Sequence, residues 1–257
     1  MKRDLTGRLV IRMRDRSLQE VKDRLATLVS YELNEDDFYD VADKHLNERG
    51  TVENRLSEVY QNTLAEVSQK MNEMDNHMGM TPNCQLGCAF CCYFPIIVNR
   101  LEAKMLVHSI EQMEESRRED LKNHLTNYFK KYSSTIETCT SIDYENDPDA
   151  KLKYKRENLP CPLLDEEKQA CKAYEARPLP CRTYVNYMDP KICAENHVPE
   201  EAVSFEFLYD GYMGALNEAA QAVYEEEDPD FLDYPSDVYQ YDYLPAFLKE
   251  WMQEGRL

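Results

Sequence analysis

The sequence predicts a mainly α-helical protein, in which bundle-like helical modules surround an irregular, cysteine-rich metal-binding region with little or no sheet. Three observations favour this fold class. Apolar residues recur at helical spacing through much of the chain. The 257 residues include only seven glycines, which is typical of neither a β-barrel nor a glycine-rich nucleotide fold. The cysteines gather in two groups, the second among prolines that disfavour regular helix.

The N-terminal part, residues 1–78, is predicted to be a helical module. Residues 1–16 alternate weakly between apolar and basic side chains, which fits a short strand or an extended arm. Apolar stripes then predict three helices, at 17–29, at 34–46 after a cap at Asn34, and at 51–76. These stripes are most simply explained as the core of the module.

The middle part, residues 79–199, is predicted to be a metal-binding domain. Asn99 and Glu102 have the spacing of a capping box, which predicts the start of a helix. The other elements predicted here are a helix over about 116–136, a polar linker over 140–158 and a short hairpin around Asp165–Gln169.

The C-terminal part, residues 200–257, is predicted to be an acidic helical segment that packs on the metal-binding domain, with helices over 200–227 and Leu244–Met252. Residues 195–257 hold sixteen acidic and two basic residues and supply most of the net charge of −19. Such a surface repels nucleic acid and anionic membranes. It could attract a basic protein partner, and it leaves the oligomeric state open.

The sequence favours a cytoplasmic protein. The first residues contain no apolar core of signal-peptide length, and no run approaches the roughly 18 apolar residues of a membrane span. In a reducing compartment, clustered cysteines indicate metal ligation or redox chemistry rather than a disulfide framework.

Eight cysteines are the predicted metal ligands: Cys84, Cys88, Cys91, Cys92, Cys161, Cys171, Cys181 and Cys193. If residues 84–92 form a helix or a helix-like turn, their four thiols fall within an arc of roughly 100°. Thiolates select zinc, iron–sulfur clusters or copper(I). The Cα atoms of Cys91 and Cys92 are about 3.8 Å apart, so we expect only one of them to join Cys84 and Cys88 on one ion. Two four-thiolate sites, or one cluster with structural thiols, would use all eight.

Other interpretations of the same cysteines are open. Reduced cysteines can simply pack in a core. Cys84-x3-Cys88-x2-Cys91 also resembles the cluster motif of radical S-adenosylmethionine enzymes. Those enzymes are βα barrels with glycine-rich strand ends, however, and no glycine occurs here between Gly87 and Gly211.

A longer pattern resembles the YkgJ-type cysteine-cluster family, also called CxxCxxCC, whose domain is described as zinc- or iron-chelating. The pattern is C-x3-C-x2-C-C, then Cys161-Pro162-Leu163, then Cys171-x2-Tyr174-x2-Arg177-Pro178-x2-Cys181-Arg182-x-Tyr184. The resemblance implies the same eight ligands for zinc or iron. Flagellin lysine N-methylases share the arrangement, which would link it to an iron–sulfur cluster such as 4Fe–4S. The helical parts at 17–76 and 200–257 lie outside the resemblance.

The function predicted is therefore metal binding, with zinc or iron held by clustered thiolates. One alternative is a cluster-dependent enzyme related to protein-lysine N-methylases, and another is a regulatory interaction module with a structural metal. No catalytic residue stands out, and no glycine-rich loop for an organic cofactor is visible. Arg177 and Arg182 could lower thiol pKa values or donate hydrogen bonds to cluster sulfurs, or they could pair with carboxylates. Cys139 is expected to be a spare thiol, and His197 is a minor ligand candidate.

Overall fold

The computed structural model describes residues 16–257 apart from 85–86, 196–197, 201, 228–229 and 256–257. The predicted strand or arm at 1–16 therefore lies outside the described residues, except for Arg16. The mainly α-helical class is confirmed, because helices dominate and the strands that can be described form only two-stranded sheets. No described helix is long and apolar enough to cross a membrane.

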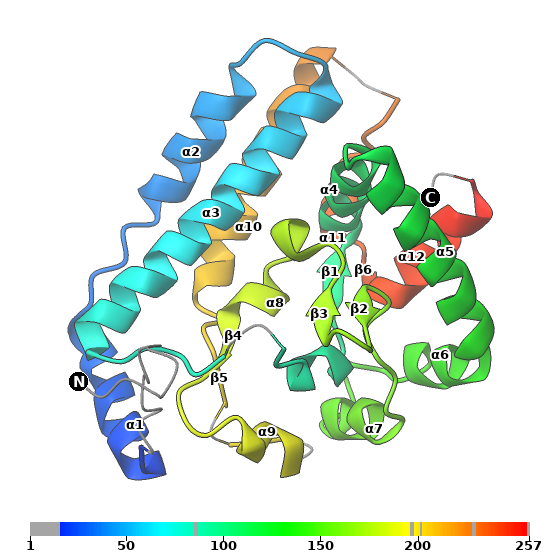
Figure 1. Ribbon diagram of the computed structural model, residues 1–257. Helices are drawn as coiled ribbons and strands as arrows, with labels where there is room; N and C mark the ends of the chain where they lie inside the picture. The colour runs from blue at the N-terminus through cyan, green and yellow to red at the C-terminus, as the bar shows by residue number, and fades with distance from the viewer. Residues whose placement is uncertain (1–15, 85–86, 196–197, 201, 228–229, 256–257) are drawn as a thin grey trace, which may run out of the picture.

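Three helices lie side by side on one flank of the molecule (Figure 1). They are α2 (Asp36–Leu46), α3 (Val52–Met78) and α10 (Leu208–Glu227), with α1 (Leu18–Leu25) and the 3₁₀ turn η1 (Ala26–Ser30) at one end. Their buried faces meet in the first core, to which Phe38, Tyr60 and Tyr212 contribute. The N-terminal and C-terminal parts of the chain thus share one hydrophobic core.

Two glycines let α10 approach α2 closely. A Cβ atom on Gly211 would lie 2.7 Å from Cδ2 of Phe38, and one on Gly214 would overlap the hydroxyl of Tyr39. Any side chain at either position would therefore push the helices apart or displace the ring of Phe38 or Tyr39.

The other flank is built round the second core, which buries Leu106, Leu125, Phe247 and Trp251. Its helices are α4 (Arg100–Glu111), α5 (Glu115–Lys131), α6 (Ser133–Thr140) and α12 (Leu244–Gln253). The predicted capping box is confirmed at the start of α4. The Asn99 side chain accepts the Glu102 N–H at 2.7 Å, and the Glu102 carboxylate accepts the Asn99 N–H at 3.4 Å.

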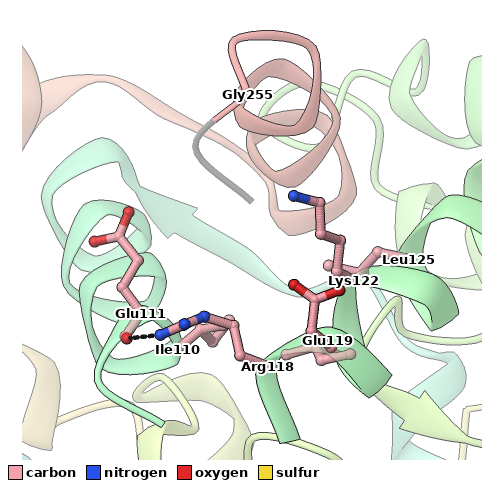
Figure 2. A pocket seen from close by; sticks show the side chains of 8 residues that line it. Ile110, Glu111, Arg118, Glu119, Lys122, Leu125 and Gly255 are labelled. Atoms are coloured by element: carbon pink, nitrogen blue, oxygen red, sulfur yellow. Dashed lines mark hydrogen bonds between the residues drawn. The ribbon is translucent and has the colours of Figure 1, made fainter. Parts of the chain in front are cut away.

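A small cavity of about 190 Å³ lies where α4 passes into α5, next to Gly255 after α12 (Figure 2). The turn between the helices is held there by Arg118, whose guanidinium donates to the carbonyl of Glu111 at 2.9 Å. The lining contains no cysteine. A metal site built from thiolates must therefore lie elsewhere.

Short elements connect the two flanks. They are η2 (Phe90–Tyr93), β1 (Ile97–Asn99), α7 (Ala150–Arg156), β2 (Leu164–Asp165), β3 (Ala170–Cys171), η3 (Tyr174–Ala176), α8 (Pro180–Thr183), β4 (Tyr184–Asn186), α9 (Lys191–Glu195), β5 (Ala202–Ser204), α11 (Ser236–Tyr239) and β6 (Tyr241–Tyr243). The antiparallel pairs are β1 with β6, β2 with β3 and β4 with β5. The pairing of β2 with β3 confirms the hairpin predicted around Asp165–Gln169.

Three predicted elements need correction. The linker expected over 140–158 contains helix α7, because the ring of Tyr154 is buried and stacks on Tyr243. The helix expected from residue 200 begins only at Leu208, since 202–204 pair with β4 instead. The helix expected over 116–136 is broken at Tyr132 into α5 and α6.

The cap predicted for the second helix is also wrong. Helix α2 begins at Asp36 after Glu35, and the side chain of Asn34 donates to the Asp37 carboxylate at 2.6 Å. The domain boundaries after residues 78 and 199 stay a prediction.

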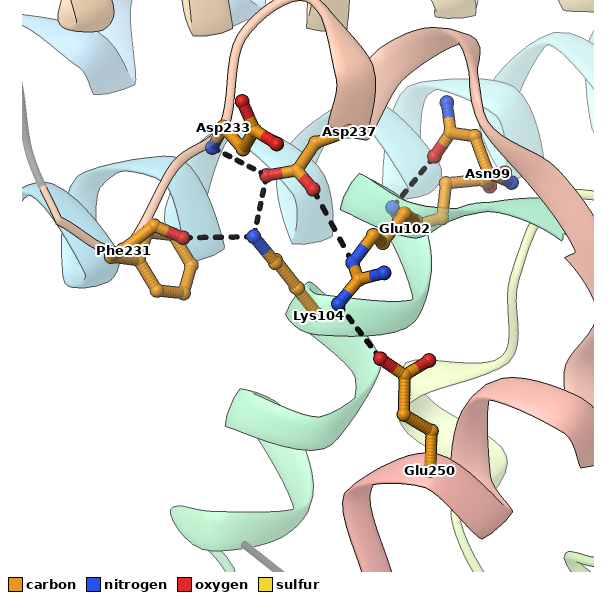
Figure 3. A network of polar contacts seen from close by, with 8 residues as sticks. Asn99, Glu102, Lys104, Phe231, Asp233, Asp237 and Glu250 are labelled. Carbon is orange, nitrogen blue, oxygen red and sulfur yellow. Dashed lines mark hydrogen bonds and ion pairs between the residues drawn. The ribbon is translucent and has the colours of Figure 1, made fainter. Parts of the chain in front are cut away.

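A buried polar network ties α4 to α11 and α12 (Figure 3). The carboxylate of Asp237 is fully buried; it accepts from Lys104 Nζ at 2.5 Å and lies 3.6 Å from Arg100 Nε. Lys104 also donates to the Phe231 carbonyl at 2.9 Å. Arg100 in turn pairs with Glu250 on α12 at 2.9 Å. Both cations thus share one carboxylate that is closed off from solvent.

The buried capping residue Glu102 makes stability depend on pH. Burial raises the pKa of its carboxyl from 4.5 to about 7, although hydrogen bonds from the Asn99 N–H and the Tyr212 hydroxyl oppose this. The folded state therefore favours the protonated acid. This contribution to stability is complete below the unfolded pKa and is lost as pH rises through the folded pKa.

We expect Glu102→Gln to remove this dependence, because glutamine keeps an oxygen for the Asn99 N–H but does not ionise. From about pH 4 to about pH 8, the unchanged protein should lose on the order of 3 kcal/mol more unfolding free energy than the variant does. Urea unfolding at both pH values measures it. Parallel pH profiles for the two proteins would contradict the assignment.

Candidate metal centre

Seven of the eight predicted ligands line one cavity of about 770 Å³ between the two flanks. They are Cys84, Cys88, Cys91, Cys92, Cys161, Cys171 and Cys181. The eighth, Cys193, lies on α9, which packs against η2 and its two cysteines. The structure therefore brings together thiols that lie far apart in the chain, as the hydrogen bonds of Asn186 show.

Asn186 at the end of β4 joins two of these thiols. Its backbone N–H donates to Cys84 Sγ at 3.3 Å, and its side-chain amide donates to Cys193 Sγ at 3.3 Å. The Asn83 N–H fixes the strand by donating to the Asn186 carbonyl at 2.8 Å. Burial raises the pKa of Cys193, and the nearby thiols of Cys88 and Cys91 raise it further, against the Asn186 hydrogen bond. We call Cys84, Cys88, Cys91 and Cys193 the first thiol group.

The other thiols are linked by a second set of contacts. Cys161, Cys171 and Cys181 pack against the second core. Burial raises the pKa of Cys181 well above its ordinary value, and the thiols of Cys161 and Cys171 raise it further. The Cys161 N–H donates to the Cys92 carbonyl at 2.6 Å, which holds the two segments together. We call Cys92, Cys161, Cys171 and Cys181 the second thiol group.

The helix predicted for residues 84–92 is wrong. Of this stretch, only the single 3₁₀ turn η2 is helical in the residues described, and Gly87 before it has a left-handed φ of 91°. Cys84 and Cys88 therefore lie on irregular backbone and do not share a helix face with Cys91 and Cys92. A lone turn after a left-handed glycine cannot continue the 3.6-residue period on which the prediction depended.

Cys91 and Cys92 meet where the two groups join. A hydrogen bond from the Cys92 thiol lowers the pKa of Cys91, and the positive charges of Arg177 and Lys155 lower it further. Cys91 is thus the thiol of this region that ionises most readily. Its thiolate would be available as a metal ligand near neutral pH.

Two cations lie beside the thiols, and only one of them could be identified from the sequence. The charge of Arg177, whose guanidinium stacks on Tyr174 at 3.7 Å, favours the thiolates of Cys91 and Cys171. The second cation, Lys155, was missed because residues 140–158 resembled a linker. Its ammonium group donates to the Phe90 carbonyl at 2.7 Å, at the start of η2.

Arg182 has a different role from the one predicted. Its guanidinium donates to Ser68 Oγ on α3 at 3.1 Å and to the carbonyls of Glu175 and Arg177 at 2.7 and 2.9 Å. It braces the segment that carries Cys181 against α3. Within the part of the chain that is described, neither Arg177 nor Arg182 forms an ion pair with a carboxylate.

Three other residues complete the comparison with the sequence: Cys139, His197 and Asn186. Cys139 is buried in a separate cluster with Tyr154 and Tyr243, as expected for a spare thiol. His197 lies outside the described residues. Asn186 could not be singled out from the sequence, because an asparagine seven residues before Cys193 carries no signal of its own.

The donor set fits a soft metal ion, since thiolates are the ligands that zinc and iron–sulfur centres prefer. Among the described residues, however, no three His, Cys, Asp or Glu side chains are arranged to hold one ion. The thiols gather around a shared space and do not converge on a point.

Fold and site together define a mainly helical protein with a cysteine-lined cavity. Residues 83–201 match the CxxCxxCC family, whose description is "Putative zinc- or iron-chelating domain". This stretch contains all eight predicted ligands and covers a little less than half of the chain, and the match confirms the resemblance inferred from the sequence. Neither a curated protein nor a solved structure matches the chain.

Proposed function

We propose that this protein binds zinc or iron through two four-thiolate sites, one formed by each thiol group. The first site uses Cys84, Cys88, Cys91 and Cys193, and the second uses Cys92, Cys161, Cys171 and Cys181. The observation that carries the division is the Asn186 bridge, whose two hydrogen bonds link Cys84 to Cys193. In the second group, the backbone hydrogen bond from the Cys161 N–H ties the second cysteine segment to the Cys92 carbonyl.

The division solves the crowding at Cys91 and Cys92. A metal ion held by four thiolates needs sulfur atoms at about 2.3 Å in a tetrahedron. Two neighbours on one ion would strain the backbone, whereas one neighbour on each of two ions would not. Binding would draw each group of sulfur atoms closer together, which cysteine side chains can achieve by rotation about χ1.

The surrounding charges support the proposal. Four thiolates around Zn²⁺ leave two negative charges, and an iron–sulfur cluster with four thiolates is also anionic. Arg177 and Lys155 lie beside the thiols and would offset this charge. A bound zinc would brace irregular backbone, and an iron–sulfur cluster would add electron transfer.

Anaerobic purification followed by metal and sulfide analysis tests the proposal. Zinc in a colourless protein indicates two structural sites, whereas iron with labile sulfide and broad visible absorbance indicates clusters. In either case we expect both thiol groups to be protected from alkylation until the metal is removed. A purified protein without metal, whose thiols all react at once, would overturn the proposal.

Asn186→Ala should weaken the first site without removing a ligand. The variant loses the amide that donates to Cys193, while the backbone bond to Cys84 can remain. Loss of an outer hydrogen bond to a ligand typically costs about 10–100-fold in metal affinity. Competition with a chelator measures this, and Asn62→Ala on the exposed face of α3 is the control. Equal affinities would exclude Asn186 from a supporting role.

A further inference from the structure

The cysteine-lined cavity is larger than a metal site requires. Its volume is about 770 Å³, and cavities that bind small molecules measure roughly 300–1,000 Å³. An ion in contact with four sulfur atoms at about 2.3 Å is enclosed by its own ligands. Most of this space would therefore remain free when metal is bound.

Besides Arg177 and Arg182 near the thiols, two opposite charges line this cavity and do not form an ion pair with each other. Lys151 on α7 and Glu206 just before α10 both line the cavity. The carboxylate of Glu206 acts on the charge of Lys151, yet no ion pair within 4.0 Å joins the two, and neither forms one with another described residue. The ammonium group of Lys151 lies 4.9 Å from the ring centre of Tyr184 and 5.0 Å from that of Phe94.

Aromatic side chains make up a further part of the lining. Tyr144, Tyr209 and Tyr241 line the cavity together with Phe94 and Tyr184. The hydroxyl of Tyr184 is buried and has no hydrogen-bond partner among the described residues. Aromatic walls with a few polar groups at fixed positions are typical of sites for small organic ligands. The unused hydroxyl adds one donor and acceptor to the two charges.

We propose that the cavity binds a small zwitterionic ligand of the α-amino-acid type beside the thiol groups. Its carboxylate would bind the ammonium group of Lys151, its ammonium group would bind the carboxylate of Glu206, and its apolar part would lie against the tyrosine rings. An anion without an ammonium group would be repelled by the carboxylate of Glu206. A cation without a carboxylate would be repelled by the ammonium group of Lys151. This inference goes beyond metal binding.

Calorimetry on the full chain as purified tests it with three related probes. L-phenylalanine carries both charges, N-acetyl-L-phenylalanine lacks the ammonium group and phenethylamine lacks the carboxylate. We expect L-phenylalanine to bind and each analogue to bind at least about tenfold more weakly, since each leaves one protein charge unpaired. No binding of L-phenylalanine, or equal binding of all three probes, would overturn the inference.

Two variants identify the groups. Lys151→Met should weaken L-phenylalanine at least about tenfold without weakening phenethylamine, which no longer meets a like charge. Glu206→Gln should likewise weaken L-phenylalanine without weakening N-acetyl-L-phenylalanine. Lys153→Met is the matched control, because Lys153 lies on the same helix but pairs with Asp147. Lys153→Met should bind L-phenylalanine as tightly as the unchanged protein does. If it loses as much affinity as Lys151→Met, the assignment to Lys151 is overturned.

Metal analysis of each sample separates the two proposals. Metal-loaded protein that fails to bind L-phenylalanine would contradict the ligand site alone. Protein that binds L-phenylalanine but holds no metal would contradict the proposed function alone. Variants that keep their metal and lose the ligand support both.

Discussion

Cys181→Ser should remove one of the two proposed metal sites and lower the stability of the flank built round the second core. Cys181 lies on α8, close to the thiols of Cys161 and Cys171, and it packs against the second core. A serine hydroxyl is a poor substitute for a thiolate toward zinc or iron. Metal binding stabilises a site that the unfolded chain lacks, so its loss should cost on the order of several kcal/mol. Metal content and thermal unfolding, measured on the same sample, record both effects.

Cys139→Ser separates the loss of a ligand from the loss of a buried thiol. Cys139 is fully buried, but it lies in the separate cluster with Tyr154 and Tyr243 and does not line the cavity. Its replacement should lower stability by about 1–3 kcal/mol through an unpaired buried hydroxyl, with full metal content. Cys88→Ser extends the comparison to the first site. If Cys181→Ser keeps as much metal as Cys139→Ser, Cys181 is not a ligand.

The helices that could be predicted are those whose sequence alone decides them. Helix α3 begins at the Thr51 cap and carries one apolar stripe along its length, and α4 begins at a capping box. Both signals lie within a few residues of the element they define. The terminal helix, predicted over Leu244–Met252, likewise ends within a residue of α12.

Elements that depend on distant partners were predicted poorly. The apolar spacing around Val203 fits a helix, but its backbone pairs with Val185 and forms a strand. Helix α7 looked like a linker because five of its seven residues, including Tyr154, are polar or charged. Its buried side includes the ring of Tyr154 and Ala150. In each case tertiary packing overrides local preference.

The same limit applies to the site. The eight cysteines could be named from their spacing, because clustered thiols in a reducing compartment usually bind metal or carry out redox chemistry. The division of the cysteines into two groups could not be predicted. Cys84 and Cys193 are linked through hydrogen bonds from Asn186, which lies 102 residues from Cys84 in the chain. Lys151 and Glu206 are also distant in the chain, yet both line the same cavity.

Asp237→Ala should destabilise the protein by about 3–5 kcal/mol, the usual result of removing one partner from a buried ion pair. Among the described residues, the variant leaves buried Lys104 with the Phe231 carbonyl as its remaining hydrogen-bond acceptor. It also removes the acceptor for the Asp233 N–H. Arg100 keeps its partner Glu250. Urea unfolding at neutral pH measures the loss as a lower midpoint.

The exposed pair of Lys153 and Asp147 provides the control, because a pair of this kind contributes only about 0–1 kcal/mol. Asp147→Ala should therefore unfold at nearly the same urea concentration as the unchanged protein.

The second core, which the Asp237 network anchors from α4 to α12, also packs against three cysteines of the second thiol group. Metal release from Asp237→Ala during unfolding should consequently shift to lower urea together with the loss of helix. A variant that unfolds like Asp147→Ala would show that Lys104 reaches solvent or another acceptor once Asp237 is gone.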